Sequence, residues 1–221
     1  MALENIQLRK LLKILFLEPN QRRSALRADI RDDRGRETGE AGSGGDFYGP
    51  FWADAKAHVF GRGDLTTATA ARIAANARRR NLYPRLHDGF MIWWTERRRW
   101  TNEPFNVGRS LKSQFRFPGL DAIVKIDSVL TVQDGNGDEF AVYSYFAPEP
   151  HLTPDAARLG LWLLTRALPA VPPTQVRILD VIRGVTFSLD RNPLSGEEEI
   201  EFRARYARLI QERDELLREY D

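Results

Sequence analysis

The sequence predicts an α/β (α+β) fold, in which a helical N-terminal half packs on a small mixed β-sheet with flanking helices. Three observations predict this class. Helix-type spacing of apolar residues dominates the first 115 positions. Two β-rich runs, 122–132 and 139–146, flank a turn-forming segment. An apolar run at 153–168, capped by Thr153, then predicts a helix.

The N-terminal half is expected to be mainly helical. It begins with a predicted amphipathic helix over 4–17, followed by a Gly-rich mobile loop near 31–45. A short helix is predicted from Pro50 to about residue 60, and two more over 67–80 and 83–100. The segment at 107–115 is either a helix or a connection. We therefore divide the chain into a helical region, 1–115, and an α/β core, 116–221, which together form one compact unit.

The C-terminal half alternates between strand and helix patterns. Runs 175–182 and 184–189 predict two further strands. Ser195 and Glu198 have the spacing of a capping box, which predicts that the last helix begins at Ser195. This helix is amphipathic, and its apolar face could hold a protein partner or a second copy of the chain. The face comprises Phe202, Tyr206, Leu209, Ile210, Leu216, Leu217 and Tyr220.

Composition excludes several kinds of site. A chain of 221 residues with 42% hydrophobic residues can bury a core of its own. It has no cysteine, which excludes disulfides, thiolate zinc sites and cysteine nucleophiles. The apolar run at 11–17 is too short to span a bilayer, and no signal-peptide cleavage site follows it. We therefore expect a cytoplasmic protein without membrane contact.

The net charge of +2 hides an uneven distribution. Residues 1–70 carry 11 basic and 10 acidic side chains, residues 71–116 carry 11 and 3, and residues 117–221 carry 11 and 18. The segment charges are therefore +1, +8 and −7. Such asymmetry indicates either an anionic partner for the basic middle or the docking of one half on the other.

The segment Asp134-Gly-Asn-Gly-Asp138 has two interpretations. Its oxygen-bearing residues alternate as in a calcium loop, but an EF-hand loop needs a glutamate at its twelfth position, where this chain has Tyr145. Asn-Gly and Gly-Asp are strong hairpin-turn dipeptides, so a hairpin turn is favoured.

A hairpin centred on Asn136 sets a register for the two strands. Residues whose numbers sum to about 272 then face each other, so that Leu130 pairs with Val142 and Val132 pairs with Phe140. The same register places Asp127 opposite Tyr145, with Tyr143 one diagonal step away.

The order strand, turn, strand, helix resembles the core of the RecB-like branch of the PD-(D/E)XK nuclease superfamily. Segment 124–129 is similar to the family's aspartate strand, 141–146 to its acid-any-lysine strand, and 153–159 to the start of its following helix. The resemblance covers about residues 115–189. It implies that Asp127 is a catalytic residue and a metal ligand, and that Mg²⁺ or Mn²⁺ is the cofactor of an active enzyme.

The chain departs from the family pattern on the second strand. Tyr143 and Tyr145 stand where the second acid and the lysine belong, and a phenol with a pKa of about 10 replaces neither group. We therefore expect a catalytically inactive protein with no cofactor. The alternative is an active metal-dependent nuclease with a rearranged site, built from Asp127 with Glu149 or Asp155. Two plainer roles remain open, namely an ion pair of Asp127 with Lys125 and, as the helix-capping alternative, a first-turn acid role for Asp155 behind the Thr153 cap.

Arginines cluster in the basic middle with tryptophans among them. Guanidinium groups pair with phosphates and aromatic rings stack on bases, which makes this region a candidate nucleic-acid-binding surface. The candidates are Arg78, Arg79, Arg80, Arg97, Arg98, Arg99 and Lys112. Ion pairing within the protein or between subunits, and plain solvent exposure, are the alternatives.

The resemblance implies a nuclease-fold protein of bacterial style within a larger DNA-processing or defence complex, and with the missing acid and lysine we expect it to bind DNA, RNA or a partner without cutting. A protein-interaction subunit with no nucleic-acid role is the third hypothesis, after the active nuclease.

Overall fold

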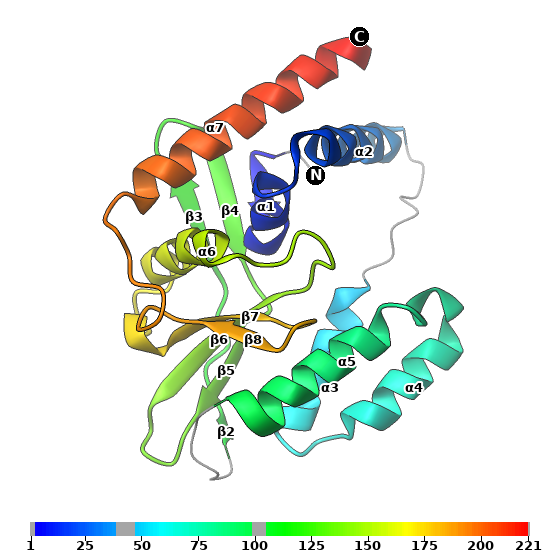
Figure 1. Ribbon diagram of the computed structural model, residues 1–221, viewed down its shortest axis with the longest axis vertical. Coiled ribbons are helices and arrows are strands. Elements are labelled where there is room, and N and C mark those ends of the chain that lie inside the picture. The colour runs from blue at the N-terminus through cyan, green and yellow to red at the C-terminus, as the bar shows by residue number, and fades with distance from the viewer. Residues whose placement is uncertain (1–2, 39–46, 99–104, 221) are drawn as a thin grey trace.

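The computed structural model describes residues 3–38, 47–98 and 105–220. Helices surround two small β-sheets (Figure 1), which confirms the α+β class. The helices are α1 (Leu8–Leu15), α2 (Pro19–Glu37), α3 (Tyr48–Val59), α4 (Leu65–Ala75), α5 (Tyr83–Ile92), α6 (Pro154–Ala167) and α7 (Glu198–Leu217). The strands are β1 (Asn5–Gln7), β2 (Asn106–Val107), β3 (Ser113–Phe117), β4 (Ala122–Ile126), β5 (Leu130–Gln133), β6 (Glu139–Tyr145), β7 (Val176–Asp180) and β8 (Val185–Phe187).

The larger sheet has the strand order β2-β5-β6-β7-β8. β5 and β6 form an antiparallel hairpin, α6 connects β6 to the parallel strand β7, and β8 returns antiparallel at the edge. Helix α6 lies over one face of this sheet and α3–α5 lie over the other (Figure 1). Because both faces are covered, nearly every side chain of β6 is buried.

The smaller sheet has the order β1-β4-β3, with β1 parallel to β4. It packs against α1, α6 and α7, and its Phe117 ring lies 5.2 Å from that of Phe202 and 5.4 Å from that of Tyr206 on α7. The protein thus has two apolar cores. We call them the α6–α7 core, which contains Ile6, Phe117, Tyr143 and Phe202, and the α3–α5 core, which contains Trp52, Phe90, Val142 and Leu179.

The predicted hairpin register is confirmed within the hairpin itself. Leu130 pairs with Val142 and Val132 with Phe140, and the backbone N–H of Gly137 donates to the carbonyl of Asp134 in the turn. The predicted pairing of Asp127 with Tyr145 is wrong. The run 122–132 is two strands in different sheets, because the backbone turns at Ser128, whose φ of 57° lies in the left-handed region.

The first 38 residues differ from the prediction in two places. The chain begins with β1, whose Ile6 pairs with Val124, before the helix starts at Leu8. Three residues are too few to show the period-2 signal of a strand. α2 continues to Glu37, so the predicted mobile loop is helical over 31–37, while 39–45 lies outside the described residues. Ion pairs with α7 hold the polar helix in place, among them Arg22–Glu212 at 2.8 Å and Arg213–Asp33 at 3.0 Å.

The three helices predicted between Pro50 and Trp100 are present, and α4 and α5 are shorter than predicted. α5 ends at Ile92 and continues as a π-helical turn over Trp93–Arg97, while Arg99 and Trp100 lie outside the described residues. The helix alternative for 107–115 is wrong, because β2 and the start of β3 occupy this segment. The division at 115–116 falls within β3, and β1, α1 and α2 pack with the C-terminal half.

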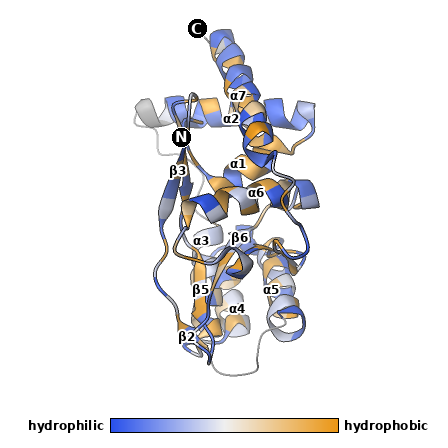
Figure 2. Ribbon diagram, turned by 90° about the vertical axis from the view of Figure 1, so that its left-hand side faces the viewer, coloured by the Kyte–Doolittle hydropathy of each residue, from blue (hydrophilic) through white to orange (hydrophobic). Residues whose placement is uncertain are grey.

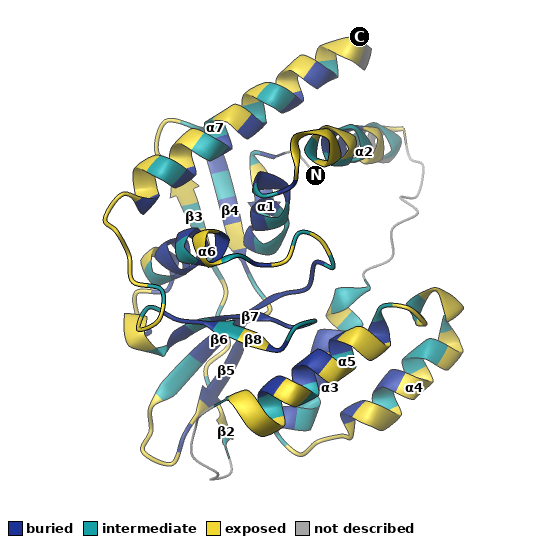
Figure 3. Ribbon diagram, viewed as in Figure 1, coloured by how far each residue is buried: buried dark blue, intermediate teal, exposed yellow. Residues whose placement is uncertain are grey.

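The apolar face of α7 faces inward. Phe202, Tyr206, Leu209 and Leu216 are at most 2% exposed and belong to the α6–α7 core. Blue, hydrophilic residues dominate α2, while orange, hydrophobic stretches mark β5 and α1 (Figure 2). Buried and exposed positions alternate along α7 (Figure 3). The expectation that this face holds a second copy of the chain is wrong, because the protein's own core occupies it. No helix in the described ranges combines the length and apolarity needed to cross a bilayer.

Candidate nucleic-acid interface

Asp127 lies where β4 ends, and its partners come from the end of β1 and the first turn of α1. The guanidinium Nη2 of Arg9 donates to Oδ1 of Asp127 at 2.5 Å, and Nε2 of Gln7 donates to Oδ2 at 3.0 Å. Both carboxylate oxygens are therefore engaged, and the cation is Arg9 rather than Lys125, which is exposed. Sequence reasoning missed Arg9 because it lies 118 residues away in the chain.

Tyr143 and Tyr145 are buried side chains of the α6–α7 core. The Tyr143 hydroxyl accepts from the backbone N–H of Arg9 at 3.0 Å, and the Tyr145 hydroxyl donates to the carbonyl of Pro150 at 2.8 Å. Burial raises the pKa of both phenols. They therefore stay neutral and act as packing groups with satisfied hydroxyls, which cannot serve as anionic metal ligands.

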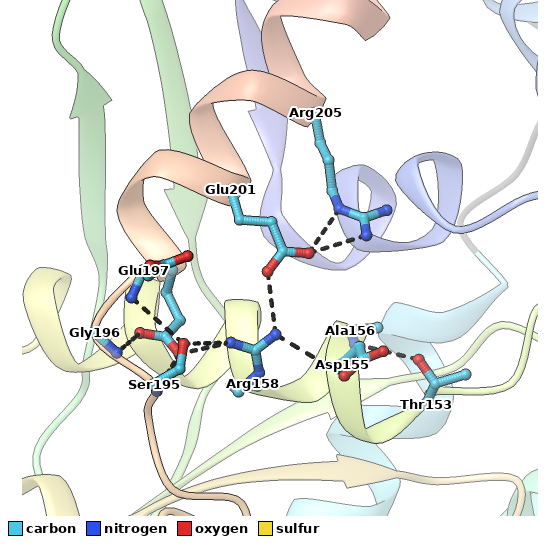
Figure 4. Close-up of polar contacts among 10 residues, drawn as sticks. Thr153, Asp155, Ala156, Arg158, Ser195, Gly196, Glu197, Glu201 and Arg205 are labelled. Carbon is cyan, nitrogen blue, oxygen red and sulfur yellow. Dashed lines mark hydrogen bonds and ion pairs between the residues drawn. The ribbon is translucent and has the colours of Figure 1, made fainter.

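The two other candidate acids pair with separate arginines. Glu149 Oε1 lies 3.7 Å from Nη2 of Arg183, and Asp155 Oδ1 lies 3.9 Å from Nη2 of Arg158 (Figure 4). Asp155 sits in the first turn of α6 behind the Thr153 cap, whose hydroxyl accepts from the N–H of Ala156 at 3.2 Å, as the helix-capping alternative predicts. Within the described ranges, no three carboxylate or imidazole groups gather closely enough to hold an ion. These residues do not fit a Mg²⁺ or Mn²⁺ site, which needs several oxygen ligands on one ion.

Arg158 joins α6 to the start of α7 (Figure 4). Its guanidinium donates to Glu198 at 2.7 Å and to Glu201 at 3.1 Å. α7 begins at Glu198, so Ser195 is not its N-cap as predicted. Glu198 instead accepts from the backbone N–H groups of Ser195 at 2.6 Å and Gly196 at 3.0 Å. Burial favours the neutral acid, but these hydrogen bonds outweigh it and lower the pKa of Glu198 to about 2.

The first arginine triplet is divided by the fold. Arg79 lies over the Tyr83 ring, 5.2 Å from its centroid, and donates to the carbonyl of Arg72 at 3.4 Å. Arg78 and Arg80 are exposed, as is Lys112 just before β3. The structure therefore gives Arg79 a packing role and leaves the other three side chains on the surface.

Arg97 and Arg98 of the second triplet line a cleft of about 340 Å³ between the π-helical turn and β8. Nη1 of Arg97 donates to the carbonyls of Arg183 and Gly184 at 3.1 and 3.3 Å. The guanidinium carbon of Arg98 lies 3.9 Å from the Trp94 ring centroid. The full lining is Trp93, Arg97, Arg98, Phe140, Arg177, Thr186, Ser188, Asp190 and Arg191. Arg99 lies outside the described residues.

Two more arginines, Arg177 on β7 and Arg191 after β8, enter the cleft from the acidic half of the chain. Sequence reasoning missed both. Arg177 interrupts the apolar run at 175–182, and that interruption was the available signal. Four arginines thus line the cleft against one carboxylate, Asp190, whose pKa is lowered chiefly by a hydrogen bond from the Ser188 side chain. The cleft is positively charged within a region that is acidic overall.

Trp93 and Trp94, which the sequence placed among the arginines, are not open platforms for bases. Trp93 is 1% exposed and packs on Phe90 and Trp94, while Trp94 is covered by Arg98. The cleft therefore offers guanidinium groups for phosphates rather than rings for stacking. No protein-family model matches this chain, and neither a curated protein nor a solved structure shows significant similarity to it.

Proposed function

We propose that this protein binds nucleic acid through the cleft between the π-helical turn and β8, and that it does not cut it. The observation that carries the proposal is the set of four arginines facing a single carboxylate. Clustered guanidinium groups with few counter-charges suit the phosphate backbone, and each phosphate they neutralise releases counterions. The proposed setting, taken from the resemblance, is a larger DNA-processing or defence complex in the cytoplasm.

The layout around β6 supports a nuclease-like scaffold in its hairpin-then-helix order, because the antiparallel hairpin β5–β6 leads through α6 to β7. It departs from the resemblance at the aspartate strand, since β4 lies in the smaller sheet and does not pair with β6. The surroundings of Asp127 support inactivity, since Arg9 and Gln7 engage both of its carboxylate oxygens. In this proposal Asp127 has a structural role, because its ion pair with Arg9 holds α1 against β4. The nucleic acid instead binds on the other side of the larger sheet.

Binding is tested by fluorescence anisotropy with labelled oligonucleotides of about 20 nucleotides, as single strands and duplexes of DNA and RNA. We expect affinity to fall steeply between about 50 and 200 mM salt. Arg97→Ala and Arg191→Ala remove two exposed side chains of the cleft, and each should lower the salt slope by roughly 0.7–0.9. The matched control is Arg203→Ala, which removes an exposed arginine on α7 that does not line the cleft. Equal affinity for all four proteins would refute the proposal.

Inactivity is tested by incubating the same oligonucleotides with Mg²⁺ or Mn²⁺. We expect no cleavage by the wild-type protein. Cleavage that disappears in Asp127→Ala would show that the alternative, an active nuclease, is correct. Arg78→Ala and Lys112→Ala in the binding assay would show whether the surface cations outside the cleft contribute.

A further inference from the structure

Arg98 is a charged group for which the described residues supply no counter-charge. Its guanidinium lies over Trp94 and Phe105, 3.9 and 4.9 Å from the ring centroids. It forms no hydrogen bond or ion pair with any described residue, and its Nη1 is buried without a partner. Burial lowers the pKa of Arg98, which reflects the cost of taking the charge out of water. A desolvated guanidinium normally has an anion beside it.

Thr186 presents a second polar atom without a partner at the same cleft. It lies on β8 and pairs with Leu179 through the backbone, while its side-chain Oγ1 is buried and forms no hydrogen bond. Thr186 and Arg98 both line the cleft. Two orphaned donors at one cleft are unusual, because buried polar groups in folded proteins nearly always have partners.

The other groups at the cleft restrict what can satisfy these donors. Arg191 adds a cation, and the carboxylate of Asp190 already accepts from Ser188. The described lining of the cleft thus offers more hydrogen-bond donors than acceptors. A ligand group that completes it must bring several oxygen acceptors and negative charge, which is the chemistry of a phosphate group.

We infer that the cleft seats one phosphate group of the nucleic acid between Arg98 and Thr186, with Arg191 at its side. This inference rests on the proposed function for the source of the phosphate. Neither orphaned atom is accessible to solvent in the free protein, so contact requires side-chain movement at the cleft wall, which is common on binding. The Trp94 and Phe105 rings contact the Arg98 guanidinium in the free protein.

The discriminating variant is Thr186→Val, which keeps the side-chain shape and removes only the hydroxyl. Since that hydroxyl has no partner in the free protein, the variant should unfold at the same temperature as the wild type or higher. Binding of phosphate should weaken roughly tenfold, as expected for loss of one hydrogen bond to a charged group. A residue with a merely structural role would show the opposite pattern, with lower stability and unchanged binding.

The matched control is Thr69→Val in α4. The Thr69 hydroxyl is likewise buried without a partner, but it does not line the cleft. The Thr69→Val variant should unfold at the wild-type temperature or higher, and its binding of phosphate should be at or above the wild-type level. Arg98→Lys is the second test, because it retains the charge and loses the planar group that stacks and donates in pairs.

The first probe is inorganic phosphate, whose effect on the unfolding temperature is compared with that of chloride at equal ionic strength. We expect phosphate to stabilise the wild type and Thr69→Val, and to stabilise Thr186→Val and Arg98→Lys much less. Equal stabilisation of all four proteins, or of none, would overturn the inference.

Oligonucleotides with and without a 5′-phosphate then identify the source of the phosphate. A Thr186→Val effect confined to the 5′-phosphorylated strand indicates a terminal phosphate, and an equal effect on both strands indicates an internal one. If Arg97→Ala and Arg191→Ala weaken nucleic-acid binding while Thr186→Val and Arg98→Lys do not, the proposed function stands and the seat is refuted. If inorganic phosphate binds as expected but no nucleic acid does, the seat stands and the proposed function fails.

Discussion

Gly89→Ala should destabilise the protein, although alanine is the better helix former. Gly89 lies in α5, where the helix backbone approaches the segment after β7. A Cβ built on Gly89 would lie 2.2 Å from the carbonyl oxygen of Val181 and 2.3 Å from that of Ile182. Side-chain Cβ atoms essentially never come within 3.0 Å of such an atom, so α5 would have to move outward by about 0.8 Å.

The magnitude follows from two opposing terms. Replacing glycine by alanine inside a helix contributes about 1 kcal/mol of stability. Overpacking costs about 1–3 kcal/mol, and two rigid backbone carbonyls place this site at the upper end, about 3 kcal/mol. The free energy of unfolding should therefore fall by about 2 kcal/mol, which in a chain of this size lowers the unfolding temperature by roughly 4–8 °C.

Thermal and chemical denaturation measure the effect, with Gly63→Ala as the control. A Cβ on Gly63 meets its nearest neighbour, the Cβ of Ala57, at 4.0 Å, so that variant should match the wild type. Gly184 packs against the same helix, with a hypothetical Cβ 2.5 Å from the Gly89 carbonyl oxygen. The outward shift should therefore also move the cleft and weaken nucleic-acid binding. An unfolding temperature for Gly89→Ala equal to or above that of the wild type would refute the close approach of α5 to the Val181 and Ile182 carbonyls.

Three further predictions concern the ion pairs and α7. Arg9→Ala should lower the free energy of unfolding by about 1–3 kcal/mol because it leaves the half-buried Asp127 carboxylate without its cation, and a double-mutant cycle with Asp127→Asn should show coupling between the two. The pKa of Glu198 is depressed from 4.5 to about 2, so its stabilising contribution is present above about pH 4.5 and is lost as the pH falls towards 2. We expect about 1–2 kcal/mol after solvent screening, measured by denaturation across this range, and Glu198→Gln should abolish that part of the pH dependence. Leu209→Asp should prevent folding by placing a charge in the α6–α7 core, whereas Ile200→Asp, at a side chain 66% exposed on the same helix, should fold normally; a folded, monomeric Leu209→Asp protein would contradict this.

Sequence periodicity predicted the elements whose signals are local. The hairpin register around Asn136, the α6 cap at Thr153 and the helices α3–α5 depend on neighbouring residues, and all are present. The break between β4 and β5 was not predictable, because Ser128 adopts a left-handed conformation that serine rarely shows. The Trp52 indole N–H donates to the Ser128 carbonyl at 2.5 Å from a helix 76 residues away, and no local pattern announces that contact.

The residues of the candidate site also fall into two groups, those that local sequence patterns predict and those that only the fold brings to the cleft. Arg97 and Arg98 were identified from their clustering, since like charges close together in sequence are visible at once. Arg177 and Arg191 reach the cleft only because β7 and β8 form the edge of the larger sheet. The partner of Asp127 was mispredicted for the same reason, because Arg9 approaches it through the parallel pairing of β1 with β4.

The two cores differ in how soon a growing chain can complete them. Among the described residues, those of the α3–α5 core lie between Tyr48 and Ile182, so this core can form before α7 has been synthesised. The α6–α7 core needs Leu3 from one end and Leu216 from the other, and the hydroxyl of Tyr206 on α7 donates to the carbonyl of Leu3. Strand β1 can therefore complete its packing only after α7 has been synthesised. Pulse-labelling hydrogen exchange during refolding should accordingly show protection in α5 and β5 before protection in β1.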